Sequence, residues 1–165
     1  LTLNEWLSVL KQPEKMNYWI DFKNLSEKNV ESSMIILDNL NEKYGFKDNA
    51  FVESKNLKVL KIVKEHGFRT LLWVENIKYW KRKEHKDSVY LAKMIRNQIK
   101  ELNPDAISCE YSMYPFLCDS FPEQNIHFWD TPKDFTPENV EFTKKLCNNK
   151  SVKVVLVDYP TPDIF

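Results

Sequence analysis

The sequence predicts an α/β fold in which parallel strands alternate with helices. Short apolar segments alternate along the chain with amphipathic segments that repeat at the spacing of an α-helix. Such alternation is typical of parallel strands that are joined by right-handed helical crossovers. The chain of 165 residues has the length of one domain, so residues 1–165 are expected to form a single domain. About six strands can be counted, which leaves both a doubly wound sheet and an eight-stranded barrel open.

The helices are predicted from their capping and terminating residues. Thr2 and Glu5 have the spacing of a capping box, which opens a helix through about residue 11. Ser26 is expected to cap a long helix, which Gly45 ends, and Gly67 ends the following helix. The five helices are expected at residues 2–11, 26–45, 56–66, 88–102 and 136–148.

The strands are predicted from short runs of apolar and β-branched residues. The six strands are expected at residues 17–23, 50–53, 70–75, 106–110, 125–129 and 152–158. The stretch between the fourth and fifth strands contains Pro115 and Pro122 and is expected to be irregular. Because a small barrel takes about eight strands, six strands should leave an open edge beside the first strand and another beside the last.

Composition argues against several classes of function. The 24 Lys and Arg residues equal the 24 Asp and Glu residues, so no net positive charge favours nucleic-acid binding. The chain has only two glycines, which excludes the glycine-rich phosphate loops of nucleotide-binding proteins. No apolar stretch is long enough for a transmembrane helix. The first residues do not have the pattern of a signal peptide. A processed or truncated amino terminus would have lost one, so a cytoplasmic and a cell-envelope location both stay open.

The cysteines and histidines form no metal-binding motif. The three cysteines have no CxxC spacing: Cys109, Cys118 and Cys147. They are expected to be small buried apolar side chains, and a Cys109–Cys118 disulfide is the alternative. The three histidines are scattered and have no zinc-ligand spacing: His66, His85 and His127.

Polar residues gather at the ends of the predicted strands. Besides Asp21 and Lys23, they are Glu53, Glu75, Glu110, Asp130 and Asp158. In a parallel α/β fold the carboxyl ends of all strands lie on one face, where functional sites form. Strand alternation places Trp19, Asp21 and Lys23 on the inner face and points Ile20 toward the helices. A carboxylate beside an amine suits a divalent cation, Mg²⁺ or Ca²⁺, held together with a phosphate, although charges at strand ends can simply face solvent.

Four segments, in this order, resemble the glycerophosphodiester phosphodiesterase family of the phosphatidylinositol-phospholipase-C-like barrel superfamily. Residues 1–7 (LTLNEWL) resemble its P-T-L-E-E-hydrophobic-L helix, and residues 18–23 (YWIDFK) resemble its E-I-K strand. Residues 126–131 (IHFWDT) resemble its V-x-V-W-T-V-N strand, and residues 157–160 (VDYP) resemble its closing T-D-Y-P. The sequence departs from the family pattern in three places: Asp21 replaces Glu, Glu53-Ser54-Lys55 replaces Ser-Phe, and Asp130-Thr131-Pro132 replaces Thr-Val-Asn.

The resemblance implies a parallel (β/α)8 barrel of the phosphodiesterase type, with strands three to eight present and the first two units missing. The family's H-R-G strand, its E-x-D strand and its second catalytic histidine precede the helix with which this chain begins. The chain therefore contains none of the family's catalytic residues, and alone it is expected to be nearly inactive. The implied activity of the whole protein is metal-assisted hydrolysis of glycerophosphodiesters or related lipid-derived phosphodiesters.

The resemblance also implies roles for particular residues. Asp21 would bind a divalent cation once the upstream acidic ligands are present, and Lys23 would face the phosphate of a small-molecule phosphodiester. The remaining substrate-binding candidates are Glu53, Glu110 and Trp129, with Tyr18 or Trp19 as a further apolar wall for the alcohol. His66 is expected on the far side of the sheet, and His127 in the core.

Two alternatives stay open. One is a non-catalytic barrel relative that acts as a ligand-binding or scaffold protein, which the shorter side chain of Asp21 favours. The other is a different α/β enzyme, such as a glycosidase, that uses Glu53, Glu75 and Glu110 as paired acids. The oligomeric state is left open by the sequence.

Overall fold

The computed structural model describes residues 2–76, 88–129 and 136–157. It divides the chain into two compact units. The N-terminal unit comprises Leu1–Leu72 and Leu102–Asp105, and the C-terminal unit comprises Trp73–Glu101 and Ala106–Phe165. Both units are built from parallel strands that alternate with helices, so the predicted α/β class is confirmed and the single-domain prediction stays a prediction.

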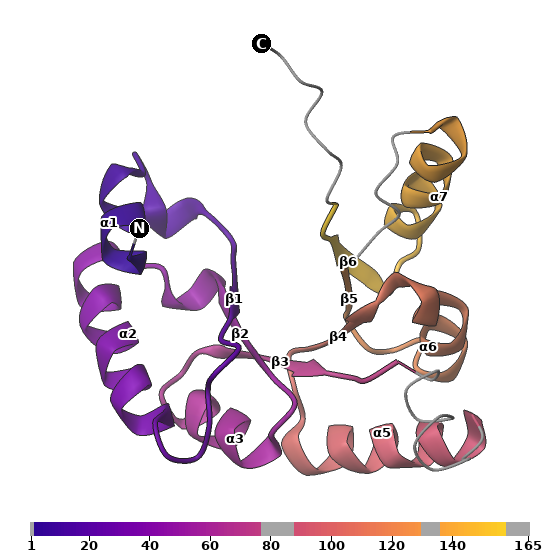
Figure 1. Ribbon diagram of the computed structural model, residues 1–165, viewed down its shortest axis with the longest axis horizontal. Coiled ribbons are helices and arrows are strands. Elements are labelled where there is room, and N and C mark those ends of the chain that lie inside the picture. Colours follow the sequence, from indigo (N-terminus) through magenta and orange to yellow (C-terminus); the bar gives the residue numbers. More distant parts are fainter. Residues whose placement is uncertain (1, 77–87, 130–135, 158–165) are drawn as a thin grey trace. The chain divides into compact units, whose positions relative to one another are not determined.

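The N-terminal unit contains three parallel strands whose order follows the chain. The strands are β1 (Tyr18–Asp21), β2 (Ala50–Ser54) and β3 (Arg69–Trp73), of which Trp73 is already counted with the C-terminal unit. The helices around them are α1 (Leu3–Val9), α2 (Val30–Tyr44) and α3 (Leu57–Glu65), and two short 3₁₀ turns are η1 (Pro13–Lys15) and η2 (Lys47–Asn49) (Figure 1). Among the strands that the structure describes, β1 pairs only with β2, which agrees with the predicted open edge.

The helix ends follow the local chemistry of the sequence, with one exception. The Thr2 hydroxyl accepts a hydrogen bond from the Glu5 amide while the Glu5 carboxylate accepts one from the Thr2 amide, so the predicted capping box is confirmed. Gly45 ends α2 in the left-handed conformation, at φ 67°. The prediction that Ser26 caps α2 is wrong by one turn. Its amide and hydroxyl both donate to Asn29 Oδ1, which closes a turn that delays the helix to Val30.

Aromatic rings from successive elements form much of the core of the N-terminal unit. The Tyr18 ring centroid lies 5.3 Å from that of Phe46, which in turn lies 6.2 Å from Phe68. Ile20 of β1 and Phe22, just beyond it, pack against the same cluster, so both face the helices as predicted. Aliphatic side chains complete the cluster: Leu7, Val30, Met34, Leu37, Ala50, Val52, Val59 and Val63.

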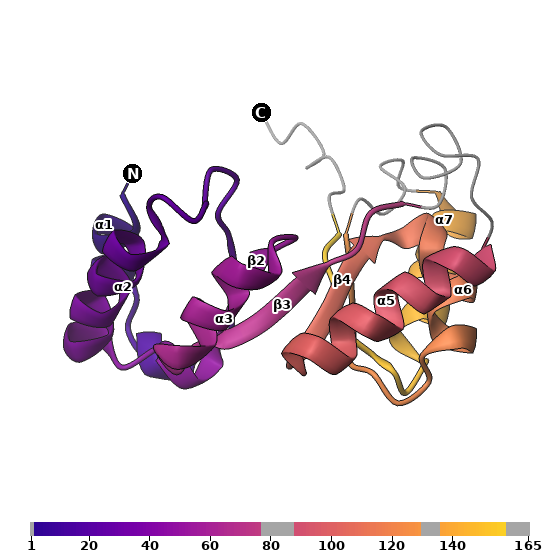
Figure 2. The ribbon, with the colours of Figure 1, turned by 90° about the horizontal axis from the view of Figure 1, so that it is seen from below.

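A return segment, Leu102–Asp105, completes the N-terminal unit after the chain has passed through α5 (Ser88–Leu102). The buried Thr70 donates from its amide and its hydroxyl to the Asp105 carboxylate, at 2.8 and 3.0 Å, and its carbonyl accepts from the Asp105 amide. The Lys64 ammonium donates to the carbonyls of Leu102 and Asn103, at 3.1 and 2.7 Å. The start of β3, which follows α3 in Figure 2, thus depends on residues that come much later in the chain.

The C-terminal unit repeats the parallel arrangement. Its strands are β4 (Ala106–Glu110), β5 (Ile126–Trp129) and β6 (Val152–Val155), again in chain order, with a register shift between β5 and β6 at Ile126 and His127. Its further elements are η3 (Tyr111–Met113), α6 (Tyr114–Ser120) and α7 (Pro137–Cys147), which lies along β6 (Figure 1). Among the described strands, β6 pairs only with β5, in agreement with the second predicted edge.

Two predictions about the secondary structure of this unit are wrong. The stretch around Pro115 is not irregular but contains α6, because a proline in the first helical turn lacks only an amide hydrogen that would have had no helical partner. The last strand ends at Val155 rather than at residue 158.

Only one of the three cysteines is buried, although all three were predicted to be. All three cysteines are free, so the alternative of a Cys109–Cys118 disulfide is not present. Cys109 is buried as predicted, but Cys118 is only partly buried and Cys147 is exposed, since its helix turns that position toward solvent. Within the described parts of the chain, no helix combines the length and the apolar character that crossing a bilayer requires.

Candidate functional site

An ion pair marks the carboxyl end of β1. The Lys23 ammonium lies 2.5 Å from a carboxylate oxygen of Asp21. The prediction that both side chains lie on the inner face of a strand is wrong for Lys23, because β1 ends at Asp21 and Lys23 belongs to the turn that follows. The lysine side chain is 76% exposed and the aspartate side chain 42% exposed. Such an exposed pair contributes about 0–1 kcal/mol to stability, so little folding energy opposes its opening toward a ligand.

The neighbouring strand brings a second carboxylate to this end of the N-terminal unit. Glu53 on β2 is the register partner of Asp21 on β1, so their Cα atoms belong to adjacent strands about 4.8 Å apart. Glu53 is 6% exposed and is followed by Ser54, which is 8% exposed. The structure therefore places Asp21, Lys23 and Glu53 together, with one carboxylate in solvent and the other in the interior.

An aromatic groove of about 360 Å³ runs along β1 beside this pair. Its lining comes from α1 and β1 and consists of Leu3, Trp6, Asn17, Tyr18, Trp19, Ile20, Asp21 and Phe22. The groove could accommodate an apolar part of a ligand whose charged part reaches the Asp21–Lys23 pair. Both aromatic candidates of the sequence, Tyr18 and Trp19, line it, although Tyr18 also belongs to the core.

The remaining candidates lie in the C-terminal unit, again at strand ends. Glu110 ends β4 and is the register partner of Trp129, which ends β5. The Asn76 side-chain amide donates to the Glu110 carboxylate and, at 3.0 Å, to the Ser112 hydroxyl. The Trp129 ring meets the Trp73 ring edge-to-face, with centroids 6.3 Å apart. Glu110 and Trp129, two candidates from the sequence, therefore lie side by side at the strand ends of one unit.

Two residues of this second group were missed by sequence reasoning. Trp73 lies at the end of β3 and Asn76 lies just beyond it, within the segment TLLWVEN. The signal that could have found them is the polar and aromatic character of that segment, of which only Glu75 was singled out. Asp130 and Asp158, two other predicted strand-end carboxylates, lie outside the described residues.

The donor set can be tested against a divalent cation. Carboxylates such as Asp21 and Glu53 are oxygen ligands of the kind that Mg²⁺ and Ca²⁺ prefer. Within residues 2–76, 88–129 and 136–157, however, no three His, Cys, Asp or Glu side chains come close enough to hold a metal ion. The described residues alone do not fit a divalent cation, and the metal-binding role of Asp21 stays a prediction that requires further ligands.

Neither described histidine is placed for chemistry at the strand ends. His66 caps the carboxyl end of α3, where its Nδ1 lies 2.5 Å from Asp38 Oδ2 and its Nε2 lies 3.5 Å from Glu31 Oε2. His127 is 2% exposed within β5, which confirms its predicted core position. His85 lies outside the described residues.

Comparisons with known proteins show the fold. No family model and no curated protein sequence matches the chain. A solved structure from Silicibacter pomeroyi DSS-3, assigned as a glycerophosphoryl diester phosphodiesterase, is 10% identical with a TM-score of 0.59; the match covers 96% of this chain and 52% of that chain. This chain thus spans about half the length of that structure. A glycerol uptake operon antiterminator-related protein from Thermotoga maritima MSB8 is also 10% identical, with a TM-score of 0.48, over 86% of this chain and 94% of that chain.

The first of these likenesses shows that the chain has a fold similar to that of the solved structure. At 10% identity it concerns the α/β arrangement and not the activity, and the assignment of the six strands to positions three to eight of a barrel stays a prediction.

Proposed function

We propose that this chain is part of a phosphodiesterase-type α/β protein that binds glycerophosphodiesters or related lipid-derived phosphodiesters at the carboxyl ends of its strands. The observation that carries the proposal is the exposed Asp21–Lys23 pair at the end of β1. It lies at the strand ends of a chain whose fold is similar, over 96% of its length, to that of a glycerophosphoryl diester phosphodiesterase. Strand ends of parallel α/β proteins are where their ligands bind.

Lys23 is the proposed phosphate ligand. Its ammonium is a compact point charge on a flexible stem, which suits a phosphoryl oxygen. In the absence of ligand, Asp21 holds that ammonium at 2.5 Å, and a bound phosphodiester would take over the contact. Asp21 would then be released toward a divalent cation that further ligands complete.

The other candidates are proposed for each unit by itself: Glu110 and Trp129 as groups of the C-terminal unit that could contact a hydroxyl or alkyl part of a ligand, and Glu53 as a neighbour of Asp21 in the N-terminal unit. Glu110, which already accepts a hydrogen bond from Asn76, has further acceptor positions for a hydroxyl group. Trp129 and Trp73 provide aromatic faces against carbon-bound hydrogens. Glu53 is proposed to orient the groups around Asp21 from the neighbouring strand.

Hydrolysis would add the hydroxide of a water molecule to phosphorus, while the departing alcohol oxygen receives the remaining proton. The resemblance assigns both proton transfers to histidines that are absent from this sequence, so we expect this chain to bind a diester without cleaving it. Cleavage of glycerophosphodiesters by the 165-residue chain alone would overturn this assignment of roles.

Isothermal titration calorimetry with glycerophosphoglycerol, a diester without an ammonium group, tests the proposal with and without added Ca²⁺ or Mg²⁺. Lys23→Met should weaken binding about tenfold, since the one charge-assisted hydrogen bond proposed for the phosphate is lost. Lys28→Met, at an exposed lysine five residues further along the same loop, is the matched control and should bind as the unchanged chain does. No saturable binding, or an equal loss in both variants, would contradict the proposal.

The alternative of a non-catalytic relative is separated by a second experiment. In a protein extended upstream by strands that carry the family's histidines and Glu-x-Asp acids, Asp21→Asn should weaken metal binding and lower kcat. If the extended protein binds the diester but does not turn it over, the ligand-binding alternative is favoured.

A further inference from the structure

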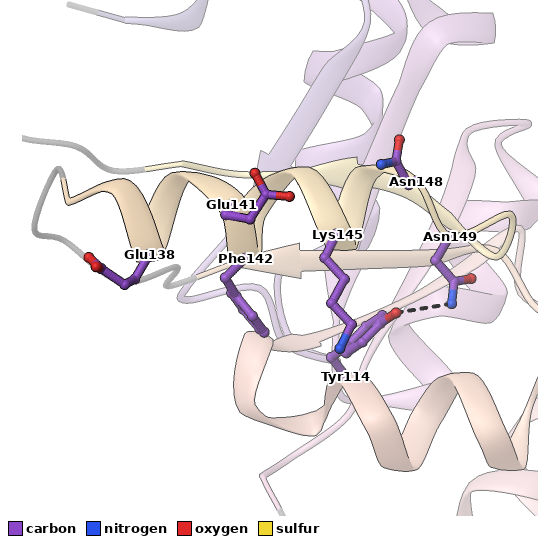
Figure 3. A pocket seen from close by; sticks show the side chains of 7 residues that line it. All are labelled: Tyr114, Glu138, Glu141, Phe142, Lys145, Asn148 and Asn149. Atoms are coloured by element: carbon purple, nitrogen blue, oxygen red, sulfur yellow. Dashed lines mark hydrogen bonds between the residues drawn. The ribbon is translucent and has the colours of Figure 1, made fainter.

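A second groove lies in the helical layer of the C-terminal unit, between α7 and the first residue of α6. Its volume is about 610 Å³, within the range of small-molecule sites. It is lined by Tyr114, Glu138, Glu141, Phe142, Lys145, Asn148 and Asn149 (Figure 3). None of these residues belongs to the strand-end groups described above.

The aromatic part of the groove is held rigidly. The Tyr114 ring contacts the buried Phe128 and the Phe142 ring, with centroid distances of 5.8 and 6.4 Å. Phe142 also contacts Tyr111, at 5.7 Å. These edge-to-face contacts fix both rings that line the groove before any ligand arrives, which lowers the entropy lost on binding.

Hydrogen-bond donors converge at one end of the groove. The Tyr114 hydroxyl accepts a hydrogen bond from the Asn149 side-chain amide at 3.3 Å, so its own hydrogen can be donated elsewhere. The side-chain oxygen of Asn149 already accepts a hydrogen bond from the Ser151 backbone amide. This contact orients the side-chain nitrogen of Asn149 toward Tyr114. Figure 3 shows the Lys145 side chain extending from α7 toward the same tyrosine.

Among the described residues, the pairing of charges along α7 leaves Lys145 without a carboxylate partner. Glu141 and Lys145 have the i,i+4 spacing and the orientation that favour an ion pair on a helix. Glu141 instead pairs with Lys144, at 3.6 Å, and Lys145 makes no ion pair within the described part of the chain. Glu138, one turn before Phe142, likewise has no ion-pair partner among the described residues.

The groove therefore has two oppositely charged ends with an aromatic ring between them. Glu138 and Lys145 are seven residues apart, about 10.5 Å along the helix axis, and Lys145 leans back toward the amino terminus as helical side chains do. The helix dipole accounts for the order of these charges, with the acid first and the base last. It does not account for the tyrosine hydroxyl, the asparagine amide or the fixed rings that meet the charges.

We propose that this groove binds a small zwitterion. Its anionic oxygen group would accept from Lys145 and from the Tyr114 hydroxyl, and its ammonium would lie over the Phe142 ring beside Glu138. Aromatic rings bind quaternary and primary ammonium groups through the negative face of the ring, and a nearby carboxylate strengthens that attraction. A phosphocholine group, whose two charges are separated by a two-carbon bridge, is the probe of this chemistry. The proposal goes beyond the phosphodiesterase proposal and does not depend on it.

The test is a titration of the isotopically labelled 165-residue chain with phosphocholine, followed by the amide signals in NMR spectra. Saturable shifts confined to Tyr114 and residues 136–149 are expected, with Kd of about 1 mM, as for a single small ligand. Choline alone and inorganic phosphate alone should each bind at least about tenfold more weakly, because each can occupy only one end.

Matched variants localise the effect. Lys145→Met should weaken phosphocholine binding about tenfold, whereas Lys150→Met, at an exposed lysine of the same unit that does not line the groove, should change it less than about twofold. Phe142→Leu keeps an apolar side chain but removes the ring, and should weaken binding about fivefold. The NMR spectra themselves show that each variant is folded.

The two sources of such a zwitterion can be told apart. Co-sedimentation with phosphatidylcholine vesicles that depends on Lys145 would identify a lipid headgroup as the ligand, and binding of free phosphocholine without vesicle binding would identify a soluble one. The proposal is overturned if no saturable shifts appear at about ten times the expected Kd. It is also overturned if phosphate alone binds as well as phosphocholine, or if Lys150→Met weakens binding as much as Lys145→Met.

Discussion

The stability of the N-terminal unit should depend on pH through a cluster that connects α2 to α3. His66, at the end of α3, is held between Asp38 and Glu31 of α2, and Lys47 of η2 lies 2.5 Å from the other oxygen of Asp38. The hydrogen bond to Asp38 is the main reason why the pKa of His66 is raised above its usual 6.5. Burial opposes ionisation of Asp38, but the hydrogen bonds from Lys47 and His66 outweigh it and lower the pKa of that carboxyl.

The direction of the pH effect follows from these shifts. Because the pKa of His66 is higher in the folded state, its stabilisation is fully present below about pH 6.5 and is lost as the pH rises through the folded pKa. Asp38 acts in the opposite direction, since its stabilisation is present above its unfolded pKa and is lost only in acid. Between these limits, near pH 5.5, both groups are charged and the connection between the helices is strongest.

The size of the effect follows from exposure. The His66 side chain is 23% exposed and that of Asp38 is 31% exposed, so the pair is neither fully buried nor free in solvent. A charge-assisted hydrogen bond in that position contributes about 1 kcal/mol. The free energy of unfolding should therefore fall by about 1 kcal/mol between about pH 5.5 and about pH 8.5, beyond any change seen in His66→Gln.

Urea denaturation followed by circular dichroism measures this difference at both pH values. Lys47→Met is the control: it removes the other partner of Asp38 and lowers stability, but should leave the fall between the two pH values in place. The reasoning is refuted if His66→Gln shows the same fall as the unchanged chain. An imidazole pKa at or below 6.5 for His66, measured by NMR, would refute it as directly.

Two further predictions concern other parts of the structure. Gly45→Ala should destabilise the chain by about 1 kcal/mol in urea denaturation, because φ is 67° there and favours glycine. The nearest atom to a new Cβ lies at 3.4 Å, so the loss would come from the backbone and not from a clash. An unchanged denaturation midpoint would contradict the backbone argument. With iodoacetamide near pH 8, the exposed Cys147 should be modified first. Cys118 should react about a hundredfold more slowly, because burial, aided by Asp119, raises its pKa to about 11. Equal modification rates of the two cysteines in peptide mass analysis would contradict this.

Local signals in the sequence were sufficient for most elements and for several helix ends, but not for the ends of the strands. The Thr2–Glu5 capping box and the terminating Gly45 act within one helical turn, so a sequence pattern captures them. The extent of β1 depends instead on its pairing with β2, which stops at the register pair Asp21 and Glu53. Extending strand alternation two residues beyond that point placed Lys23 in the interior, where the structure does not have it.

The candidate site was predictable only where it coincides with strand ends. Glu110 and Trp129 come together because neighbouring parallel strands are in register, which alternation and strand order anticipate. The contact of Asn76 with Glu110 joins residues that no local pattern relates, so it needed the structure. Helix α6 was missed for a different reason: Pro115 was interpreted as a helix breaker, although at the start of a helix it is well tolerated.

The return segment Leu102–Asp105 has a consequence for biosynthesis. On a ribosome the N-terminal unit cannot acquire its full set of hydrogen bonds when Leu72 emerges, because the buried Thr70 still lacks Asp105 and Lys64 lacks the carbonyls of Leu102 and Asn103. At about 5–20 residues per second the missing residues follow roughly two to seven seconds later. During that interval the start of β3 lacks its hydrogen-bond partners. Translation through α5, rather than completion of β3, therefore sets the moment at which this unit can become native.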